Sequence, residues 1–373
     1  MQIKQIVTFL LKGLKNIIFF VQRFVLTFNI ICAFSLICSA LAQIVNPNTF
    51  SLLAFFGLAF PFLLFINILF LWYWLLRHKW YFLWSLWSII LNFQNISYTF
   101  SNGTNKIVTK NQQTLKVMSY NVQNFDLYNW EKNKDTRNNI LEFIDKKSPD
   151  VINFQEFYSE DNGVFNNVAL LQKMGYKYYH FQTTFRLRDN DNWGLATFSK
   201  FPIVQKRYID FENEKLNGII TTEIIVDSQK IMIINAHLQS VHFSNLDYKF
   251  LEQKSKRTFT ANIFAILGKL RRAFIQRSYQ VALLIPLIST TIPTILTGDF
   301  NDTPSSFSYY SIRKSMESAF EQAGSGFGNT YNGIFPSFRI DHIFVNNFIT
   351  VLNYNRIKNN YSDHYPIIAE ITW

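Results

Sequence analysis

The first hundred residues consist of long apolar runs separated by short polar breaks. Residues 24–44 and 51–76 contain no Asp, Glu, Lys or Arg, and residues 80–93 form a shorter apolar run that polar residues extend to position 97. About 20 consecutive apolar residues are needed to cross a bilayer. The pattern therefore predicts a membrane anchor over residues 1–100 with about three transmembrane helices, at 24–44, 51–76 and 80–97.

A polar stretch rich in Asn, Thr and Lys follows the apolar block and indicates a linker over residues 101–113. Beyond it, short apolar runs typical of strands alternate with amphipathic stretches typical of helices. The expected strands are 115–122, 151–155, 176–183, 195–198, 219–226, 230–237, 294–297, 340–345, 349–354 and 366–373, and the expected helices are 134–146, 164–174, a long segment within 246–288, and 306–319. This mixture predicts one α/β (α+β) domain over residues 114–373.

Charge is distributed unevenly between these two parts. Only 6 of the 36 Lys and Arg residues lie in residues 1–100, but that block contains no Asp or Glu, so it holds more than half of the net charge of +11. The basic balance is therefore weak evidence for binding nucleic acid and is typical of charges that flank membrane spans. The apolar content excludes a disordered chain and a uniformly basic wrapper of nucleic acid.

The positions of the basic residues predict an orientation. Lys15 and Arg23 precede the first apolar run, Arg77 and Lys79 separate the second from the third, and the loop at residues 45–50 is uncharged. The positive-inside rule places both basic segments in the cytoplasm. With three crossings, the chain is a multi-pass protein of the bacterial inner membrane whose folded domain lies outside the cytoplasm. If the third run only lies in the interface, that domain stays inside.

Polar clusters interrupt the predicted strands at five places. Both cysteines, Cys32 and Cys38, lie in the first apolar run, so the folded domain contains no disulfide and no thiolate metal site. Its chemistry must come from oxygen and imidazole groups. The five clusters are residues 119–124, 150–156, 234–240, 296–302, and the pair 339–343 with 362–366.

Several residues in these clusters suit a hard metal ion and a phosphate. Asp299 and Asn301 are two positions apart, so in an extended chain their side chains share a face. Glu156 ends a buried strand, where an unpaired carboxylate would be costly. Oxygen ligands without thiolates favour Mg²⁺ or Mn²⁺. His364 has Asp341 available as an orienting carboxylate, which is the usual arrangement for moving a proton near neutral pH.

Taken singly, each cluster also has an ordinary structural interpretation, as a turn, a strand end or a solvated cap. Together, their order and spacing resemble the endonuclease–exonuclease–phosphatase superfamily over residues 115–373. The resemblance implies a four-layer sandwich of two mixed β-sheets flanked by helices, here preceded by the transmembrane region. It also implies a site at the ends of the sheets and hydrolysis of a phosphate ester that depends on Mg²⁺ or Mn²⁺.

The resemblance also implies roles for individual residues. Glu156 resembles the principal metal ligand of the family, with Asn121 beside it and Asp363 joining the metal environment. Tyr331 follows a glycine-containing loop. It is expected either to line the substrate groove or to serve as an ordinary turn residue.

The remaining expected roles concern the phosphate and the attacking water. Asp299 and Asn301 look like the pair that positions both of them. His364 resembles the general base, or a histidine that contacts the phosphate, with Asp341 as its orienting carboxylate. His237 resembles a second histidine that donates a hydrogen bond to a phosphate oxygen, so Asn301, His237 and Tyr331 are the expected substrate contacts.

Residues 241–276 form a basic helical insertion before the Asp299 cluster, in which Lys and Arg alternate with apolar side chains. Two interpretations carry equal weight. The insertion contacts anionic lipid headgroups or a polyanionic substrate, or it packs on its own domain with a solvated basic face.

These features predict a membrane-anchored phosphoesterase that hydrolyses a phosphodiester or phosphomonoester and depends on a divalent metal. Such an enzyme is a nuclease or a lipid- or inositol-type phosphatase. Its substrate is nucleic acid or a phospholipid headgroup, membrane lipids are its other partner, and no protein partner can be inferred. The alternative is a catalytically inactive, membrane-tethered binding module of the same fold. A transporter is disfavoured because the apolar runs lack acidic residues.

Overall fold

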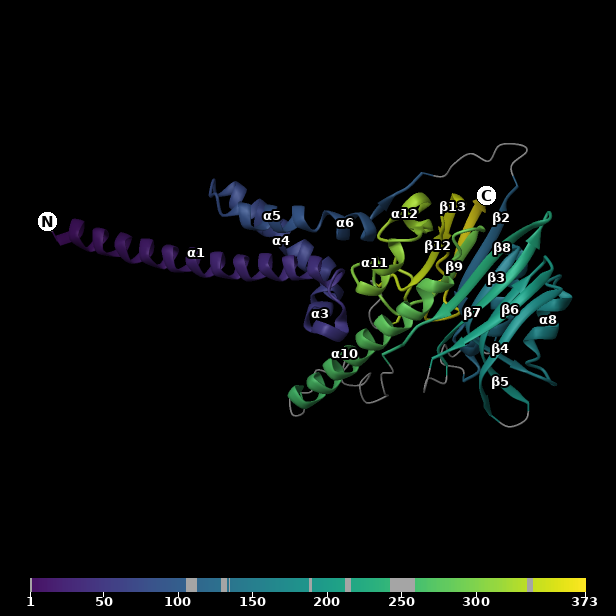
Figure 1. Ribbon diagram of the computed structural model, residues 1–373. Coiled ribbons are helices and arrows are strands. Elements are labelled where there is room, and N and C mark those ends of the chain that lie inside the picture. The colour runs from purple at the N-terminus through teal and green to yellow at the C-terminus, as the bar shows by residue number, and fades with distance from the viewer. Residues whose placement is uncertain are drawn as a thin grey trace.

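Two six-stranded β-sheets pack face to face at the centre of the folded domain in this computed structural model (Figure 1). The structure describes residues 2–104, 113–128, 133, 135–187, 190–211, 216–241, 259–333 and 338–373. The first sheet has the order β13 (Thr350–Arg356), β14 (Ile367–Thr372), β2 (Leu115–Asn121), β3 (Val151–Glu160), β5 (Asp191–Ser199) and β4 (Tyr178–Leu187). The second has the order β10 (Glu317–Ser318), β12 (Asp341–Val345), β9 (Thr294–Asp299), β8 (Gln229–His237), β7 (Gly218–Val226) and β6 (Ile203–Asp210).

Both sheets are mixed. β2 and β3 run parallel, as do β8 and β9, whereas the other neighbouring strands are antiparallel. Every residue of β9 is buried, because its two faces pack into different cores: Ile295 lies in the core between the sheets and Leu296 in the core under the outer helices. A core of aliphatic side chains such as Val117, Ile233 and Ile295 fills the space between the sheets.

Helices cover the two outer faces. On the first sheet, α7 (Thr136–Lys147) and α8 (Asn167–Lys173) bury Ile140, Ile144 and Leu171 against the strands. On the second, α10 (Phe259–Leu284) and α11 (Phe307–Arg313) bury Val281, Leu284 and other apolar side chains. The short elements are η1 (Gln123–Asp126), η2 (Ile285–Leu287), α12 (Ala319–Ala323), β1 (Ser101–Asn102) and β11 (Ser325–Gly326). The predicted four-layer fold is confirmed.

The structure shifts several predicted boundaries and adds one long strand and three strands of two residues. All ten predicted strands are present, but β6 and the short β1, β10 and β11 had no predicted counterpart. The edge strand β6 carries Lys206 and Arg207 and is partly exposed, so it lacks an apolar run. The predicted helix at 306–319 is wrong in its second half, because β10 separates α11 from α12. Residues 105–112 of the predicted linker and 242–258 of the predicted insertion lie outside the described residues.

The N-terminal block forms six helices: α1 (Gln2–Ala42), α2 (Pro47–Phe50), α3 (Leu52–Leu58), α4 (Phe60–Leu76), α5 (Phe82–Leu91) and α6 (Phe93–Thr99). Only Leu10–Ala42 forms a single described helix that is long and apolar enough to cross a membrane. The second predicted span is broken by a bend of 68° between α3 and α4, so it qualifies only if the pair counts as one span. α5 has 10 residues, which rise about 15 Å and therefore cover only half of a bilayer core. Helix length thus supports the first predicted span, supports the second only if α3 and α4 form one broken span, and does not support the third.

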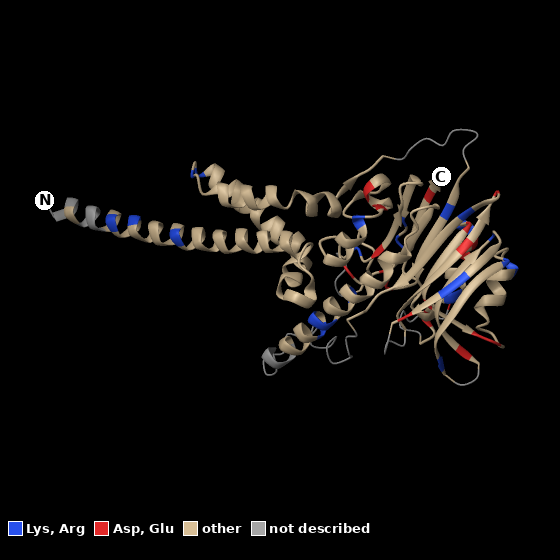
Figure 2. Cartoon of the chain, viewed as in Figure 1, with Lys and Arg blue, Asp and Glu red and all other residues tan. Residues whose placement is uncertain are grey.

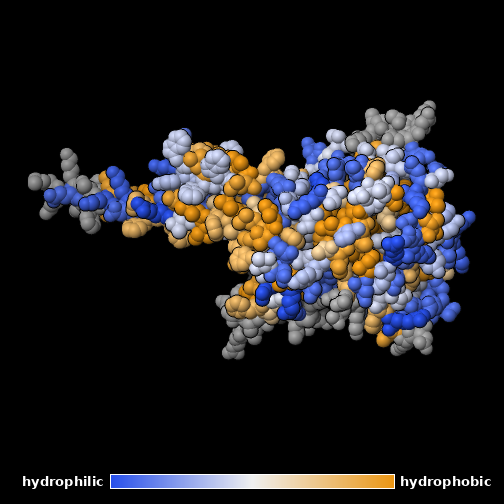
Figure 3. Space-filling view, viewed as in Figure 1, coloured by the Kyte–Doolittle hydropathy of each residue, from blue (hydrophilic) through white to orange (hydrophobic). Residues whose placement is uncertain are grey.

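Polar side chains hold α1, α4 and α5 together. Asn29 donates to Ser85 at 2.7 Å, and Ser85 donates to Asn67 at 3.1 Å. Closer to the folded domain, Ser39 donates to Asn92 at 2.9 Å. Inside an apolar bundle such groups must satisfy one another, because lipid offers no partner. The outer face of the bundle is apolar instead (Figure 3).

The N-terminal helices pack directly on the folded domain. Gln43, just after α1, donates to the carbonyl of Pro304 at 3.4 Å in the loop that follows β9. The buried guanidinium of Arg339 donates to the carbonyl of Thr99 at 3.1 Å, at the end of α6. A Gly103 amide hydrogen bond to Gly324 continues this contact into the domain. The helical block and the sheets therefore form one packed body.

Candidate functional site

The expected polar residues meet where strands of both sheets end. β8 and β9 are parallel, so His237 and Asp299, the last residues of the two strands, lie side by side in the register. Asp341 begins the antiparallel neighbour β12 and pairs with Asp299 from the other side. Asn121 ends β2 in the facing sheet. Four chain segments that are distant in sequence thus deliver side chains to one edge.

A β-bulge aims Glu156 at this edge. The pairing of β3 with β5 shifts register between Phe154 and Phe157, and Glu156 has a φ of 49°. A bulge inserts an extra residue and redirects its side chain, and a left-handed φ is costly for a residue with a Cβ atom. The side chain of Glu156 is 28% exposed, and its Oε1 lies 3.9 Å from Nε2 of His237.

Asn121 connects the carboxylates of the two sheets. Its Nδ2 donates to Glu156 Oε1 at 3.2 Å and to Asp299 Oδ2 at 3.0 Å. Its Oδ1 accepts the backbone N–H of Gln123 at 3.1 Å. In this arrangement Asn121 is a hydrogen-bond donor to two carboxylates, and its expected part in holding the metal or the scissile phosphate stays a prediction.

Asp299 and Asn301 come together through a turn, not through strand alternation. Gly298 has a φ of 150°, and a Cβ atom there would lie 1.9 Å from the carbonyl oxygen of Ala236, so only glycine lets β8 and β9 approach. Asn301 has a φ of 51°, and its N–H donates to Asp299 Oδ1 at 2.8 Å. Its Nδ2 donates to the carbonyl of Leu238 at 3.1 Å. The predicted pair is adjacent, but the extended geometry assumed for it is wrong.

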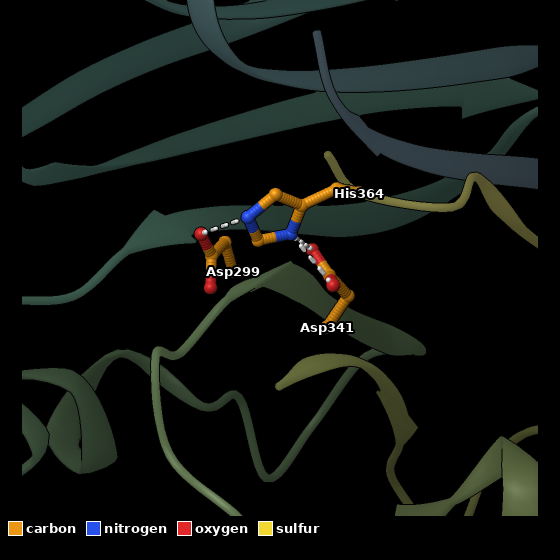
Figure 4. A group of neighbouring side chains, drawn as sticks. All are labelled: Asp299, Asp341 and His364. Carbon is orange, nitrogen blue, oxygen red and sulfur yellow. Dashed lines mark hydrogen bonds and ion pairs between the residues drawn. The ribbon is translucent and has the colours of Figure 1, made fainter. Parts of the chain in front are cut away.

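His364 lies between two aspartates (Figure 4). Its Nδ1 is 2.9 Å from Asp341 Oδ2, and its Nε2 is 3.7 Å from Asp299 Oδ2. Burial alone would lower the pKa of His364, but the carboxylates of Asp341 and Asp299 outweigh it and raise that pKa well above its usual value. The ring of Tyr331 packs edge-on against this imidazole at 5.2 Å between centroids, which places Tyr331 at the site.

His237 points a free nitrogen at the carboxylates. Its Nδ1 contacts the carbonyl of Leu216 at 3.2 Å, and its Nε2 lies 3.6 Å from Asp299 Oδ2. Among the described residues, this buried Nε2 has no hydrogen-bond partner. Leaving a buried polar atom unpaired costs about 1–3 kcal/mol. A ligand atom that forms a hydrogen bond with this Nε2 would remove that cost.

Asp363 lies at the rim of the same group. Burial raises its pKa to about 6, and the carboxylates of Glu156, Asp299 and Asp341 add to this effect against the opposing charge of His364. Its backbone N–H contacts Oε1 of Gln123 at 3.4 Å. The structure thus brings together all eight residues that were assigned to metal binding or catalysis, along with Tyr331.

A buried polar layer beneath the site was not expected from the sequence. Gln155 donates to Asn235 Oδ1 at 2.7 Å and to the hydroxyl of Ser119 at 3.2 Å, which joins β3 to β8 and β2. Asn235 in turn donates to the carbonyls of Phe154 and Ala196. The signal for this layer was present, because Ser119, Gln155 and Asn235 are each two residues from, or adjacent to, an expected site residue.

Arg277 is a further buried residue near the site whose position the sequence did not reveal. It is 1% exposed, and its Nη1 donates to the carbonyls of Asn301 and, at 3.4 Å, Gln239. Its Nε lies 3.4 Å from Asp302 Oδ2. Arg277 therefore ties α10 to the loops that follow β8 and β9. One arginine in a basic segment gave no sign of this position, because only the packing of α10 buries it.

The donor set suits a divalent cation. Four carboxylates, from Glu156, Asp299, Asp341 and Asp363, surround two imidazoles at a largely buried edge, and Asp299, Asp341 and His364 offer ligand atoms within 4.8 Å of one another. Both oxygens of Asp341 contact Nδ1 of His364. Asp341 is therefore better suited to orienting His364 than to binding a metal beside it. Glu156 and Asp299 remain as the carboxylates best placed to hold a hard ion.

Comparisons with known proteins agree with this geometry. The sequence model described as Endonuclease/Exonuclease/phosphatase family matches residues 118–364, and one described as Domain of unknown function (DUF8431) matches residues 22–99. No curated protein matches the sequence.

Two solved structures illustrate the likeness of the fold. An endonuclease/exonuclease/phosphatase from Beutenbergia cavernae DSM 12333 is 16% identical with a TM-score of 0.52, over 70% of this chain and 72% of that one. An endonuclease/exonuclease/phosphatase family protein from Leptotrichia buccalis C-1013-b is 18% identical with a TM-score of 0.50, over 69% of this chain and 100% of that one. At such identities the likeness concerns the fold alone.

Proposed function

The chain belongs to the endonuclease/exonuclease/phosphatase family, and from this premise we propose that it is a membrane-anchored hydrolase of phosphate esters that uses Mg²⁺ or Mn²⁺. The proposed organisation is an anchor over residues 1–100, a linker over 101–113 and a catalytic domain over 114–373. The substrate is a phosphodiester or phosphomonoester, in nucleic acid or in a phospholipid headgroup.

One observation supports this proposal most strongly. Glu156 and Asn121 of one sheet, with His364 just before β14 of the same sheet, meet Asp299 and His237 of the other sheet through contacts of 3.0–3.9 Å. The positions are maintained at an energetic cost, because Glu156 and Asn301 both adopt a left-handed backbone. Carboxylates and imidazoles would not be gathered at a buried edge without a charged ligand to balance them.

In the proposed reaction, Glu156 and Asp299 would hold the metal, with Asp363 in its environment and Asn121 fixing both carboxylates through its amide. A divalent cation bound there would supply polarisation of a phosphoryl oxygen and neutralisation of developing charge. Oxygen ligands without thiolates match Mg²⁺ or Mn²⁺.

The protein groups then handle the proton and the phosphate. Asp341 fixes the ring of His364, so that Nε2 of His364 faces the site and exchanges a proton with the attacking water or contacts the phosphate. We assign the unpaired Nε2 of His237 to charge on a phosphate oxygen. One N–H of the Asn301 amide donates to the carbonyl of Leu238, and we assign its other N–H to the same phosphate. Tyr331 supports the His364 ring and lines the substrate position.

The decisive experiment is a hydrolysis panel with the full-length protein in detergent, in Mg²⁺, Mn²⁺ or EDTA. The panel contains plasmid DNA, single-stranded DNA, RNA, sphingomyelin and phosphoinositides. We expect turnover of one substrate class, lost in EDTA and reduced by on the order of 10²–10⁴ in His364→Ala and His237→Ala. His78→Ala, which replaces an exposed histidine between α4 and α5, is the matched control and should keep full activity.

Two results would overturn the proposal. Undiminished hydrolysis by a folded His364→Ala protein would remove the assigned site. Failure of the wild type to hydrolyse any member of the panel, combined with tight binding of one member, would instead favour a binding module of the same fold.

The proposed membrane anchorage has a separate test. Leu10–Ala42 is apolar enough to cross a bilayer, and the basic residues near its start favour a cytoplasmic N-terminus, which places the catalytic domain outside the cytoplasm. The protein should stay in the membrane fraction after washing with alkaline carbonate. Protease added to spheroplasts should cleave the catalytic domain. Release by carbonate would contradict anchorage, and protection from protease would place the domain inside.

A further inference from the structure

A continuous apolar and basic surface extends from the anchor along the outer half of α10. The side chains that form this interfacial surface are all exposed: Phe50, Leu52, Phe264, Leu267, Arg271 and Arg272. Phe264 is 73% exposed, although it is a large aromatic residue on a well-formed helix. Exposed apolar side chains that cluster beside basic ones mark a contact surface more often than chance.

The inner face of α10 is buried in intramolecular contacts, whereas its outer face is exposed. The exposure of the outer face therefore does not result from loose packing of the helix. Ala273, Phe274, Arg277 and Val281, at helical spacing, are all buried, Val281 in the domain core and Phe274 against Phe55 of α3. On the outer face, aromatic and aliphatic side chains are flanked by arginines. This pattern is typical of a helix that lies in a membrane interface.

This helix is fixed to the anchor near the end of α1. Phe274 packs edge-on against Phe55 of α3 at 5.2 Å between ring centroids, and Nε of Arg271 donates to the hydroxyl of Ser51 at 3.0 Å. The outer end of α10 extends back past α3, on the same side of the sheets as the anchor helices (Figure 1). If Leu10–Ala42 crosses a bilayer, the helices α2, α3 and the outer half of α10 lie at the level where that span ends.

The charge of the region selects the kind of lipid. Residues 1–100 and 259–298 contain no Asp or Glu, so the anchor and α10 present basic charge only, whereas the acidic residues gather on the sheets and their loops (Figure 2). A basic, partly apolar surface is attracted to anionic headgroups, at about 1 kcal/mol per Lys or Arg near the membrane.

We propose that the interfacial surface is inserted into the headgroup region of an anionic phospholipid leaflet, so that α10 acts as a second membrane contact beside the anchor. This inference rests on the membrane anchorage proposed above. It assigns the exposed face of the basic insertion to lipid rather than to solvent. Because Arg277 of the same helix holds the loops after β8 and β9, the membrane contact and the catalytic edge share one rigid element.

The test measures depth in the membrane and does not depend on hydrolysis. The full-length protein, with Cys32→Ala and Cys38→Ala, receives single cysteines that carry an environment-sensitive fluorophore and is placed in phosphatidylcholine nanodiscs with or without phosphatidylglycerol. Probes are placed by Phe264→Cys on α10, Phe34→Cys on α1 and Val164→Cys. Val164 is a control of similar exposure, 78%, beside α8. Lipids with a spin label near the headgroup quench probes in the interface, and lipids with a spin label on the acyl chain quench the probe at position 34 inside the span.

We expect the probe at position 264 to lose more than about half of its emission in anionic discs, as an interfacial side chain does, and the probe at 164 to lose none. Equal quenching at 264 and 164, with strong quenching at 34, would overturn this inference and leave the anchor intact. Absence of quenching at 34 would overturn the proposed anchorage itself.

A charge-neutralisation control tests the choice of lipid. Arg271→Gln combined with Arg272→Gln should reduce quenching at 264 in anionic discs and leave it unchanged in discs of phosphatidylcholine alone. Lys173→Gln with Lys177→Gln removes the same charge from an exposed site on the α8 side and should change neither. Equal effects of the two double variants would contradict a specific contact with anionic lipid.

Discussion

Single residues at the site are held in positions that their intrinsic preferences oppose. Glu156 and Asn301 both have a φ near 50°, and the nitrogen Nε2 of His237 is buried without a partner among the described residues. Each feature costs free energy in the folded protein. Such costs are tolerated where a ligand compensates for them, which links the strained backbone to the proposed chemistry.

The orientation of His364 depends on Asp341, which leads to the first prediction. Asp341→Asn preserves shape but replaces the carboxylate that contacts Nδ1 at 2.9 Å. We expect kcat/KM to fall by on the order of 10²-fold, because the imidazole loses its fixed tautomer and position. Asp227→Asn, at an exposed hairpin turn, is the matched control. Steady-state kinetics on the substrate found by the panel provide the measurement, and equal rates for both variants would contradict the role of Asp341.

His180 predicts how stability responds to acid. Its Nδ1 contacts the hydroxyl of Thr222 at 2.9 Å between the sheets, and burial, with some help from Lys206, lowers its pKa from 6.5 to about 4. The unfolded chain binds a proton below pH 6.5, whereas the folded state resists it down to about pH 4. His180 therefore removes up to about 3 kcal/mol of stability as the pH falls through this window.

The measurement compares urea unfolding of the wild type and His180→Gln between pH 7 and pH 4. Glutamine does not titrate, so the variant should lose less stability than the wild type over this range. Other buried groups titrate in both proteins, so their contributions to the free energy of unfolding cancel when the two pH profiles are subtracted. Parallel pH profiles would show that His180 keeps an ordinary pKa.

At the scale of secondary-structure elements, the site depends on how closely β8 and β9 approach and on the helix behind them. Both strands end at the site, and both following loops are tied to α10 by one buried arginine. The geometry of the edge is therefore set by packing that lies outside the site.

Gly298 controls the approach of the two strands. Gly298→Ala should lower the free energy of unfolding by about 2 kcal/mol or more and abolish most activity, because its Cβ would meet the Ala236 carbonyl oxygen at 1.9 Å. Gly175→Ala is the matched control. Gly175 also has a positive φ, of 101°, but a Cβ atom there would have no neighbouring atom within 4 Å. This variant therefore has the backbone strain without the steric clash. Denaturant unfolding should show a larger loss at 298 than at 175.

Arg277 links α10 to the site loops, and its removal leaves a buried carboxylate behind. Burial raises the pKa of Asp302, and the charge of Arg277 opposes that rise. Arg277→Gln should cost about 3–5 kcal/mol of stability. Adding Asp302→Asn should restore part of that loss, since no uncompensated charge then remains. Thermal unfolding of the single and double variants tests this, and simple additivity of the two losses would show that the pair does not interact.

At the scale of the whole molecule, the N-terminal helices reach the loop that follows the turn at Asp299 and Asn301. Gly57 of α3 packs so tightly that a Cβ atom would lie 2.8 Å from the Ser305 carbonyl oxygen, four residues beyond Asn301. The helical block is therefore part of the framework that positions the site, as well as the part proposed to enter the membrane.

A bulky residue at position 57 should change the geometry of the site and lower activity. Gly57→Val should displace the loop at residues 302–305 and lower kcat by on the order of 10-fold, because small misplacements near a site reduce rates strongly. Gly13→Val, in a part of α1 where no atom lies within 4 Å, should leave kcat unchanged. Equal activity of the two variants would show that the loop adjusts without consequence.

The pattern of apolar and polar positions was sufficient for ten strands and for helices near α7, α8, α10 and α11. Strands and helices bury one face, and this leaves a periodicity that can be seen in the sequence. Polar residues such as Asp299 and His237 interrupt apolar runs, which marks strand ends, whereas the roles of the site residues came from the family resemblance of the motifs and stay predictions. Partly exposed β6 left no apolar signal, and turns at Ser51, Ala59 and Asn92 divide the second and third apolar runs into short helices, so that helix length directly supports only the first predicted span.

The sequence by itself determined which groups the protein has for chemistry, and the family order of its motifs, because these depend on residue type and spacing along the chain. Only the tertiary structure decided how those groups are used. The donor role of Asn121, the bulge at Glu156, the burial of Arg277 and the contact of Gly57 with the site loop all depend on residues far apart in the chain. Their energies come from burial and from distances across packed elements, and local patterns carry no record of either.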